Sequence, residues 1–129
     1  ANYPDCTREF RDHFERMANQ SLGTFQRGWW LDDQVKYRVL APLLKMDKSD
    51  TVKLAHELPG CWDALAYTHT SYDGKYPPTD KNHSNVLRAQ GFERAGLPDP
   101  LVVRAWREGL MELPMTPNYA LVGKESNHV

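Results

Sequence analysis

The sequence has little cysteine and no surplus of positive charge, and each of these absences excludes a class of protein. Its two cysteines, Cys6 and Cys61, form no Cys-x-x-Cys pair, so a structural zinc site of the usual spacing is not expected. Two free thiols are the simplest interpretation, and one disulfide between them stays open. Lysine and arginine number 16 against 17 aspartates and glutamates, and this balance argues against nucleic acid as a main partner.

Long apolar runs are also missing. The longest, residues 39–44, is interrupted by Pro42, whereas a membrane-spanning helix needs about 20 apolar residues. We therefore expect no transmembrane segment. The first residues show no basic start followed by an apolar stretch, so no secretory signal is expected, although a targeting peptide that was already removed would leave no trace. With 129 residues, the chain is predicted to form one domain, residues 1–129.

The sequence offers no motif of catalytic or cofactor chemistry. It has no Gly-x-Ser-x-Gly pattern and no glycine-rich phosphate loop. None of its five histidines lies four residues from another, so they suggest no metal site on one helix. These histidines are His13, His56, His69, His83 and His128. We predict no catalytic residue, no metal and no cofactor of its own.

Helical periodicity dominates what is present. Residues 7–20 carry Phe10, Phe14 and Met17 at i, i+4 and i+7, which predicts an amphipathic helix with one apolar face. A second helix is expected to begin at Asp32 or Asp33 and to end near Pro42. The further predicted helices span residues 49–58, with Ser49 or Asp50 as the cap, then 61–70, 84–95 and 100–110.

Caps and breakers complete the predicted fold. Gly96 is expected to close the fifth helix, and Asp99-Pro100 to begin the last, whose apolar stripe would be Val103, Trp106 and Leu110. For the fifth helix the predicted inner face is Val86, Leu87, Gln90 and Arg94. The predicted class is all-α, an irregular bundle of about four to six helices with an extended N-terminal joint. Residues 71–81 are predicted to form an exposed loop insertion, and residues 113–129 an extended tail.

The most unusual block is Trp29-Trp30 followed by Asp32-Asp33. Two adjacent indoles cannot both enter one core without a backbone turn, and two adjacent carboxylates need solvent, a cap or a partner. Neighbouring residues on a helix point about 100° apart, so the paired acids do not naturally face one substrate. We therefore predict a partner interface here, and it comprises Phe25, Gly28, Trp29, Trp30, Asp32 and Asp33.

Several short motifs resemble one known family when they are taken in chain order. They are Gly23 and Gly28 around an aromatic, Asp32-Asp33 before Val35, Leu58-Pro59, Trp62-Asp63-Ala64, Arg88-Ala89 and Leu97-Pro98. This order is similar to that of the small helical matrix-side subunit of mitochondrial ubiquinol–cytochrome c reductase, the ubiquinone-binding-protein type subunit of respiratory complex III. The resemblance covers most of the chain, and residues 71–81 would be an insertion relative to the family.

The resemblance implies a non-catalytic accessory subunit of the respiratory electron-transport chain. Such a subunit would lie peripherally on the matrix side of the mitochondrial inner membrane. Cytochrome b and the core subunits would be its partners, with possible lipid contact and no nucleic acid. An accessory subunit of complex I or of cytochrome oxidase is an alternative, and a small helical enzyme that uses Asp32, Asp33 and one histidine is another.

Overall fold

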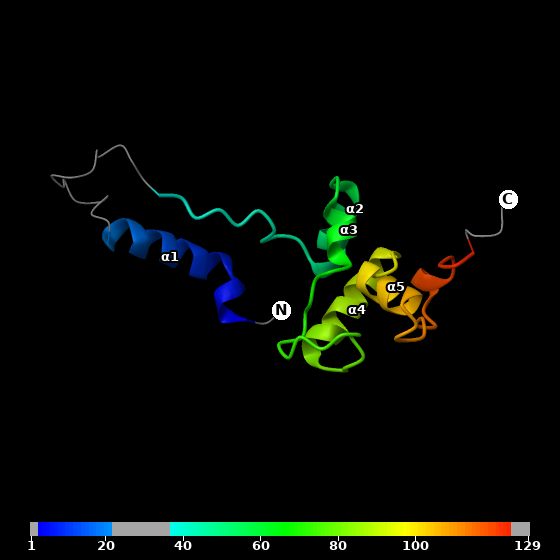
Figure 1. The fold of residues 1–129 in the computed structure, drawn as a ribbon. Coiled ribbons are helices and arrows are strands. Elements are labelled where there is room, and N and C mark those ends of the chain that lie inside the picture. The colour runs from blue at the N-terminus through cyan, green and yellow to red at the C-terminus, as the bar shows by residue number, and fades with distance from the viewer. Residues whose placement is uncertain (1–2, 22–36, 125–129) are drawn as a thin grey trace. The chain divides into compact units, whose positions relative to one another are not determined.

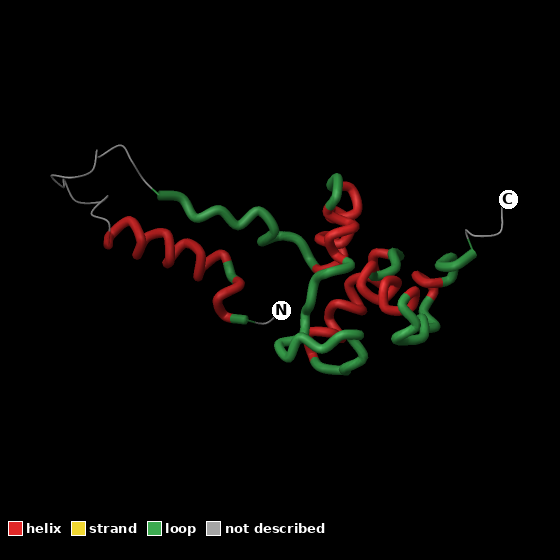
Figure 2. The backbone as a smooth tube through the Cα atoms, viewed as in Figure 1, coloured by secondary structure: helices red, strands yellow, loops and turns green. Residues whose placement is uncertain are grey.

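The computed structural model describes residues 3–21 and 37–124, and these residues belong to two compact units (Figure 1). The units are residues 1–45 and residues 46–129. The described residues form helices, turns and loops, with no strand among them (Figure 2). The all-α class and the single domain stay predictions. No helix within the described ranges is long and apolar enough to span a membrane.

The first unit is built around α1, Arg8–Ser21, which follows a short 3-10 turn, η1, Pro4–Cys6. Thr7 caps α1, because its Oγ1 accepts a hydrogen bond from the backbone N–H of Phe10 at 3.1 Å. The predicted helix over residues 7–20 is thereby confirmed to within one residue at each end. Its Phe10, Phe14 and Met17 lie on one face, as predicted, and each is about half exposed.

The polar face of α1 binds an extended segment, residues 37–39. Asn19 donates from Nδ2 to the Tyr37 carbonyl and accepts from the Tyr37 N–H, both at 2.9 Å. Glu15 Oε2 accepts from the Val39 N–H at 2.8 Å. The predicted second helix is wrong over residues 37–41, because these side chains take the backbone N–H groups that a helix would use. Its expected start at residues 32–33 lies outside the described residues.

The second unit contains α2, Lys48–Glu57, and α4, His83–Ala95, which pack against each other. Asp47 begins α2 in a capping box, since Asp47 Oδ1 accepts from the Asp50 N–H at 2.8 Å and Asp50 Oδ2 accepts from the Asp47 N–H at 3.1 Å. The prediction that Ser49 or Asp50 caps this helix is therefore wrong. Asp50 is the reciprocal member of the box.

Two shorter helices complete this unit. The helix α3, Cys61–Leu65, is one turn long, so the prediction of a helix over residues 61–70 is wrong beyond its first half. The helix α5, Pro100–Arg107, begins at the predicted cap and proline. Residues 71–81 form a loop, as predicted, and Asn82 closes it by donating to Ser71 Oγ at 2.8 Å while its Oδ1 caps α4. A short 3-10 helix, η2, Pro117–Tyr119, interrupts the predicted extended tail.

The core of residues 46–129 is made of side chains from α2, α4, α5 and η2. Its buried apolar side chains are Val52, Phe92, Leu101, Val102, Ala105 and Tyr119. The predicted inner faces of two helices are wrong, since Val86 is 39% exposed and Leu110 is 50% exposed. The buried positions of α4 are instead Arg88, Gly91 and Phe92. Gly91 lies against the Lys48 side chain, and the missing Cβ permits this close approach of α4 to α2.

Candidate functional site

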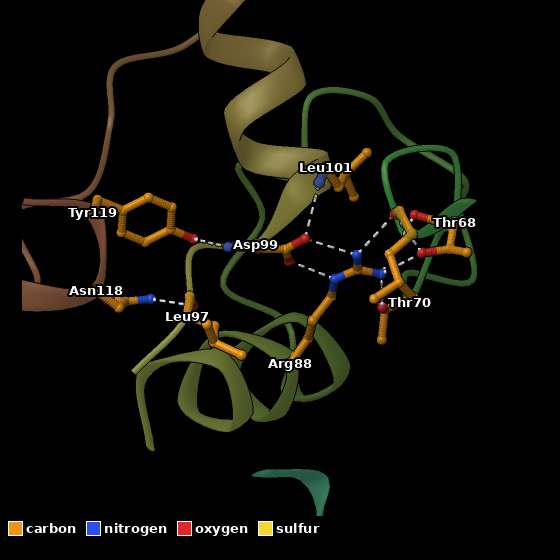
Figure 3. Close-up of polar contacts among 9 residues, drawn as sticks. Thr68, Thr70, Arg88, Leu97, Asp99, Leu101, Asn118 and Tyr119 are labelled. Carbon is orange, nitrogen blue, oxygen red and sulfur yellow. Dashed lines mark hydrogen bonds and ion pairs between the residues drawn. The ribbon is translucent and has the colours of Figure 1, made fainter. Parts of the chain in front are cut away.

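A buried ion pair between Arg88 of α4 and Asp99 at the start of α5 forms the polar centre of the second unit (Figure 3). Arg88 Nε donates to Asp99 Oδ2 at 2.6 Å, and Arg88 Nη2 donates to Asp99 Oδ1 at 2.8 Å. The two side chains are only 10% and 2% exposed. This bidentate geometry is the strongest form of an arginine–carboxylate contact.

The guanidinium of Arg88 also holds the segment that follows α3. Arg88 Nη1 donates to Thr68 Oγ1 at 2.9 Å and to Thr70 Oγ1 at 3.2 Å (Figure 3). Arg88 Nη2 additionally donates to the Leu65 carbonyl at 3.2 Å. All three nitrogens of one side chain therefore have acceptors. The charge is compensated, which a buried arginine requires.

Asp99 connects the ion pair to α5 and to η2. Its Oδ1 accepts from the Leu101 N–H at 2.9 Å and so caps the helix. The Asp99 N–H donates to the hydroxyl of Tyr119 at 3.3 Å (Figure 3). Burial, and secondarily the negative charge of Asp99, raise the pKa of the Tyr119 hydroxyl to about 12. Tyr119 is therefore neutral across the physiological range.

We name Arg88, Asp99, Thr68, Thr70 and Tyr119 the Arg88 clamp. Each charged atom in it has a hydrogen-bond partner, and the two charged side chains are nearly inaccessible. Such a saturated buried network positions chain segments and is poorly suited to exchanging protons with a substrate. The clamp fixes the segment after α3, the beginning of α5 and η2 against α4.

An open groove of about 940 Å³ lies beside the clamp, within the same unit. Leu97 and Asn118 belong to its wall, and Asn118 Nδ2 donates to the Leu97 carbonyl at 3.0 Å (Figure 3). The wall combines aromatic, apolar and charged side chains. The residues with ring or charged side chains are Trp62, Asp63, Tyr67, Arg104, Arg107 and Glu108.

Arg104 is the centre of the charged wall of this groove. Its guanidinium carbon lies 4.5 Å from the centroid of the Tyr67 ring and 4.7 Å from that of the Tyr76 ring. Arg104 Nε donates to Glu108 Oε1 at 2.8 Å, and Tyr76 donates to Glu108 Oε2 at 2.6 Å. The hydrogen bonds from Tyr76 and from Arg104 lower the pKa of Glu108. Burial and the bond to Glu108 raise the pKa of Tyr76.

The predicted site residues cannot be compared with the clamp or the groove. Phe25, Gly28, Trp29, Trp30, Asp32 and Asp33 all lie outside the described residues, so the predicted partner interface stays a prediction. No cluster of three or more histidine, cysteine, aspartate or glutamate side chains that could hold a metal occurs in residues 3–21 and 37–124. The two cysteines are free thiols in the structure.

Sequence reasoning missed the clamp and the groove. Asp99 was expected only to cap a helix, and Arg88 was noted only as part of the Arg88-Ala89 motif. A usable signal existed, because Arg88, Gly91 and Phe92 have the i, i+3, i+4 spacing of one helix face. This face was missed because its first residue, Arg88, is charged, and charged residues are not usually assigned to a core.

The chain matches a family of biosynthetic proteins. The sequence pattern of the family described as "Queuosine biosynthesis protein QueC" matches residues 1–96. The chain therefore belongs to the QueC family. This region includes α1 to α4 and ends at Gly96, just before the start of α5. The carboxylate half of the Arg88–Asp99 pair lies beyond the matched residues.

Two relatives are both named 7-cyano-7-deazaguanine synthase. The protein from Laribacter hongkongensis (strain HLHK9) is 36% identical over 104 residues, which are 81% of this chain and 40% of the relative. The protein from Chromobacterium violaceum is 38% identical over 108 residues, which are 84% of this chain and 41% of the relative. The chain thus spans about two fifths of the length of these relatives. No solved structure matches the chain.

These matches overturn the resemblance to a complex III subunit. The predicted non-catalytic accessory role in the respiratory chain is therefore wrong. So are the predicted location at the mitochondrial inner membrane and the predicted partners, which were cytochrome b, core subunits and lipid. An accessory role in complex I or cytochrome oxidase falls as well. The resemblance depended on motifs of two or three residues, which recur by chance, whereas the family pattern extends over residues 1–96.

Proposed function

We propose that this chain is part of an enzyme that produces 7-cyano-7-deazaguanine. The observation that carries the proposal is its membership of the QueC family, together with 36% and 38% identity to two proteins named as synthases of that compound. Because the chain corresponds to about two fifths of those relatives, we assign the activity to the assembled synthase and not to these 129 residues alone.

Within this proposal, the groove beside α5 is a binding site for the planar heterocycle. Its volume of about 940 Å³ lies at the upper end of the range typical of small-molecule sites, about 300–1,000 Å³. The rings of Trp62 and Tyr67 offer faces on which a deazaguanine ring can stack. The carboxylate of Asp63 can accept hydrogen bonds from the N–H groups of a guanine-type edge.

The activity is tested by genetic complementation. A bacterial strain that lacks its own 7-cyano-7-deazaguanine synthase is supplied with the protein that contains this chain, and queuosine is measured by mass spectrometry of nucleosides from total RNA. We expect queuosine to reappear. An empty vector and a vector that carries the Chromobacterium violaceum synthase are the controls. If the relative restores queuosine and this protein does not, the proposed function is wrong.

The groove is tested separately by titrating 7-cyano-7-deazaguanine into the same protein in a calorimeter. We expect Asp63→Asn to weaken binding at least tenfold, since it removes an acceptor for the N–H groups of the ligand. Glu93→Gln is the matched control, because Glu93 is an exposed carboxylate outside the wall of the groove. If the Asp63→Asn variant and the wild type bind with equal affinity, the proposal that the heterocycle binds in this groove is wrong.

A further inference from the structure

The polarity of α1 is inverted relative to that of an ordinary surface helix. Arg11, Glu15 and Asn19 recur every four residues and form the side that faces the rest of the described unit, where Asn19 and Glu15 bind the backbone of residues 37–39. Asn19 is only 3% exposed. In a globular domain the side that faces the rest of the fold is normally the apolar one.

The apolar side of α1 is open. Phe10 is 46% exposed, Phe14 is 47% exposed and Met17 is 56% exposed. The two phenyl rings stack with their centroids 6.5 Å apart, so they already form one continuous patch. Tyr37, Leu40 and Leu43 of the same unit are also exposed, and Leu40 is 82% exposed. Neighbouring exposed aromatic side chains such as Phe10 and Phe14 mark an interaction surface.

The length of the relatives points to the partner. The family match includes α1 and the following extended segment, so both belong to the shared fold. The relatives contain about three fifths of their length outside the matched region. A fold of that size has a core, and the open side of α1 has the composition of a core-facing surface.

We infer that the α1 face, defined by Phe10, Phe14 and Met17, docks on the remainder of the synthase fold, the part that corresponds to the other three fifths of the relatives. The inference rests on the proposed function, because it takes the rest of a synthase as the partner. Docking covers the three side chains with apolar surface, while Glu15 and Asn19 keep the extended segment 37–39 bound on the opposite side of the helix.

The test is a binding measurement that does not depend on activity. This chain is co-expressed with the complementary part of the Chromobacterium violaceum synthase, which carries an affinity tag, and the captured material is analysed by size-exclusion chromatography with light scattering. We expect a complex with one copy of each chain. We expect Phe14→Asp to lower the affinity at least tenfold, because it places a charge in the apolar contact. Phe14→Leu is expected to retain binding.

Met115→Asp is the matched control, since Met115 is a fully exposed apolar residue of the second unit. We expect it to bind like the wild type, and far-UV circular dichroism of each variant shows whether α1 is kept. The inference is wrong if the wild type does not bind the complementary part, if Phe14→Asp binds equally well, or if the α1 face instead makes a dimer of this chain. A complex that forms without restoring queuosine would refute the proposed function and leave the docking surface intact.

Discussion

The two units of this chain differ in what they bury. Residues 46–129 bury six apolar side chains around a bidentate ion pair whose members are at most 10% exposed. In the described part of residues 1–45 the only buried residue is Asn19. Its ion pairs are also more accessible than the buried pair of the second unit, since the Arg11, Asp12 and Glu15 side chains are 34%, 54% and 29% exposed.

This contrast separates a region with its own core from one whose described part buries no apolar side chain. Apolar burial is the main favourable term in folding, at about 25 cal/mol per Å², and exposed ion pairs contribute only about 0–1 kcal/mol each. The described part of residues 1–45 therefore lacks the largest source of stability. We expect substitutions in residues 46–129 to change the free energy of unfolding strongly, and equivalent substitutions in the first unit to matter mainly in complex.

The largest effect is expected for Arg88→Met. It leaves the Asp99 carboxylate buried without its partner and removes the donors to Thr68 and Leu65. Breaking a buried pair costs about 3–5 kcal/mol, and we expect the upper end of that range. Urea unfolding followed by circular dichroism measures the loss. Arg11→Met in α1 is the control and should cost about 1 kcal/mol or less; equal losses would abolish the contrast.

Phe92→Ala and Phe14→Ala compare the same deletion in the two units. Phe92 is 3% exposed and packs on Trp62, so its loss leaves a cavity and costs about 3–4 kcal/mol. Phe14 is 47% exposed, and its truncation should change the free energy of unfolding of the isolated chain by about 0.5 kcal/mol or less. The two values come from paired urea titrations. A large loss for Phe14→Ala in the isolated chain would show that the first unit has a core.

A third prediction concerns alkaline pH. The folded pKa of Tyr119 is raised to about 12 from an ordinary value of about 10, so the folded state holds this proton more tightly than the unfolded state does. The resulting stability is complete below about pH 10 and is lost as the pH rises towards 12, by an amount on the order of 2 kcal/mol. Unfolding titrations from pH 9 to 12 measure it. Tyr119→Phe should show a shallower decline, and an unchanged decline would contradict the raised pKa.

The smallest effect is expected for the helix caps. Asp47→Ala removes the Asp47 carboxylate that caps α2 in the second unit, while the backbone N–H of residue 47 can still donate to Asp50, and it should lower stability by about 1 kcal/mol. Thr7→Ala removes the corresponding bond in α1. Because no apolar side chain is buried against α1 in the described part of its unit, we expect that change to reduce helical ellipticity without moving the main unfolding transition. Thermal scans of both variants measure the two quantities. If Thr7→Ala shifts the main unfolding transition, the two units unfold together and this prediction is wrong.

Local chemistry made part of the fold predictable. The helix over residues 7–20, the end at Gly96 and the start at Asp99-Pro100 follow from periodicity, from a glycine at φ +71° and from a cap with a proline behind it. Each of these signals lies within a few residues of the feature that it predicts. The cap of α2 was predicted at Ser49 or Asp50 instead of Asp47, because all three side chains are able to cap a helix.

Long-range contacts made the rest unpredictable. Arg88 is buried only because Asp99 lies eleven positions further on and Thr68 twenty positions earlier, and no periodicity within one helix records that. Residues 37–41 were expected in a helix, yet side chains of α1 take two of their N–H groups from about twenty positions away. The apolar stripe of α1 was found correctly, but a stripe does not state which surface covers it.

The clamp has a practical consequence for where this polypeptide can be divided. A protein that stopped at Gly96, the last residue matched by the family, would keep the guanidinium of Arg88 and discard the carboxylate, the cap of α5 and the tyrosine that close around it. Deletion series and fusion boundaries should therefore retain everything through Tyr119, since a boundary drawn from sequence similarity alone would sever the strongest polar contact of the second unit.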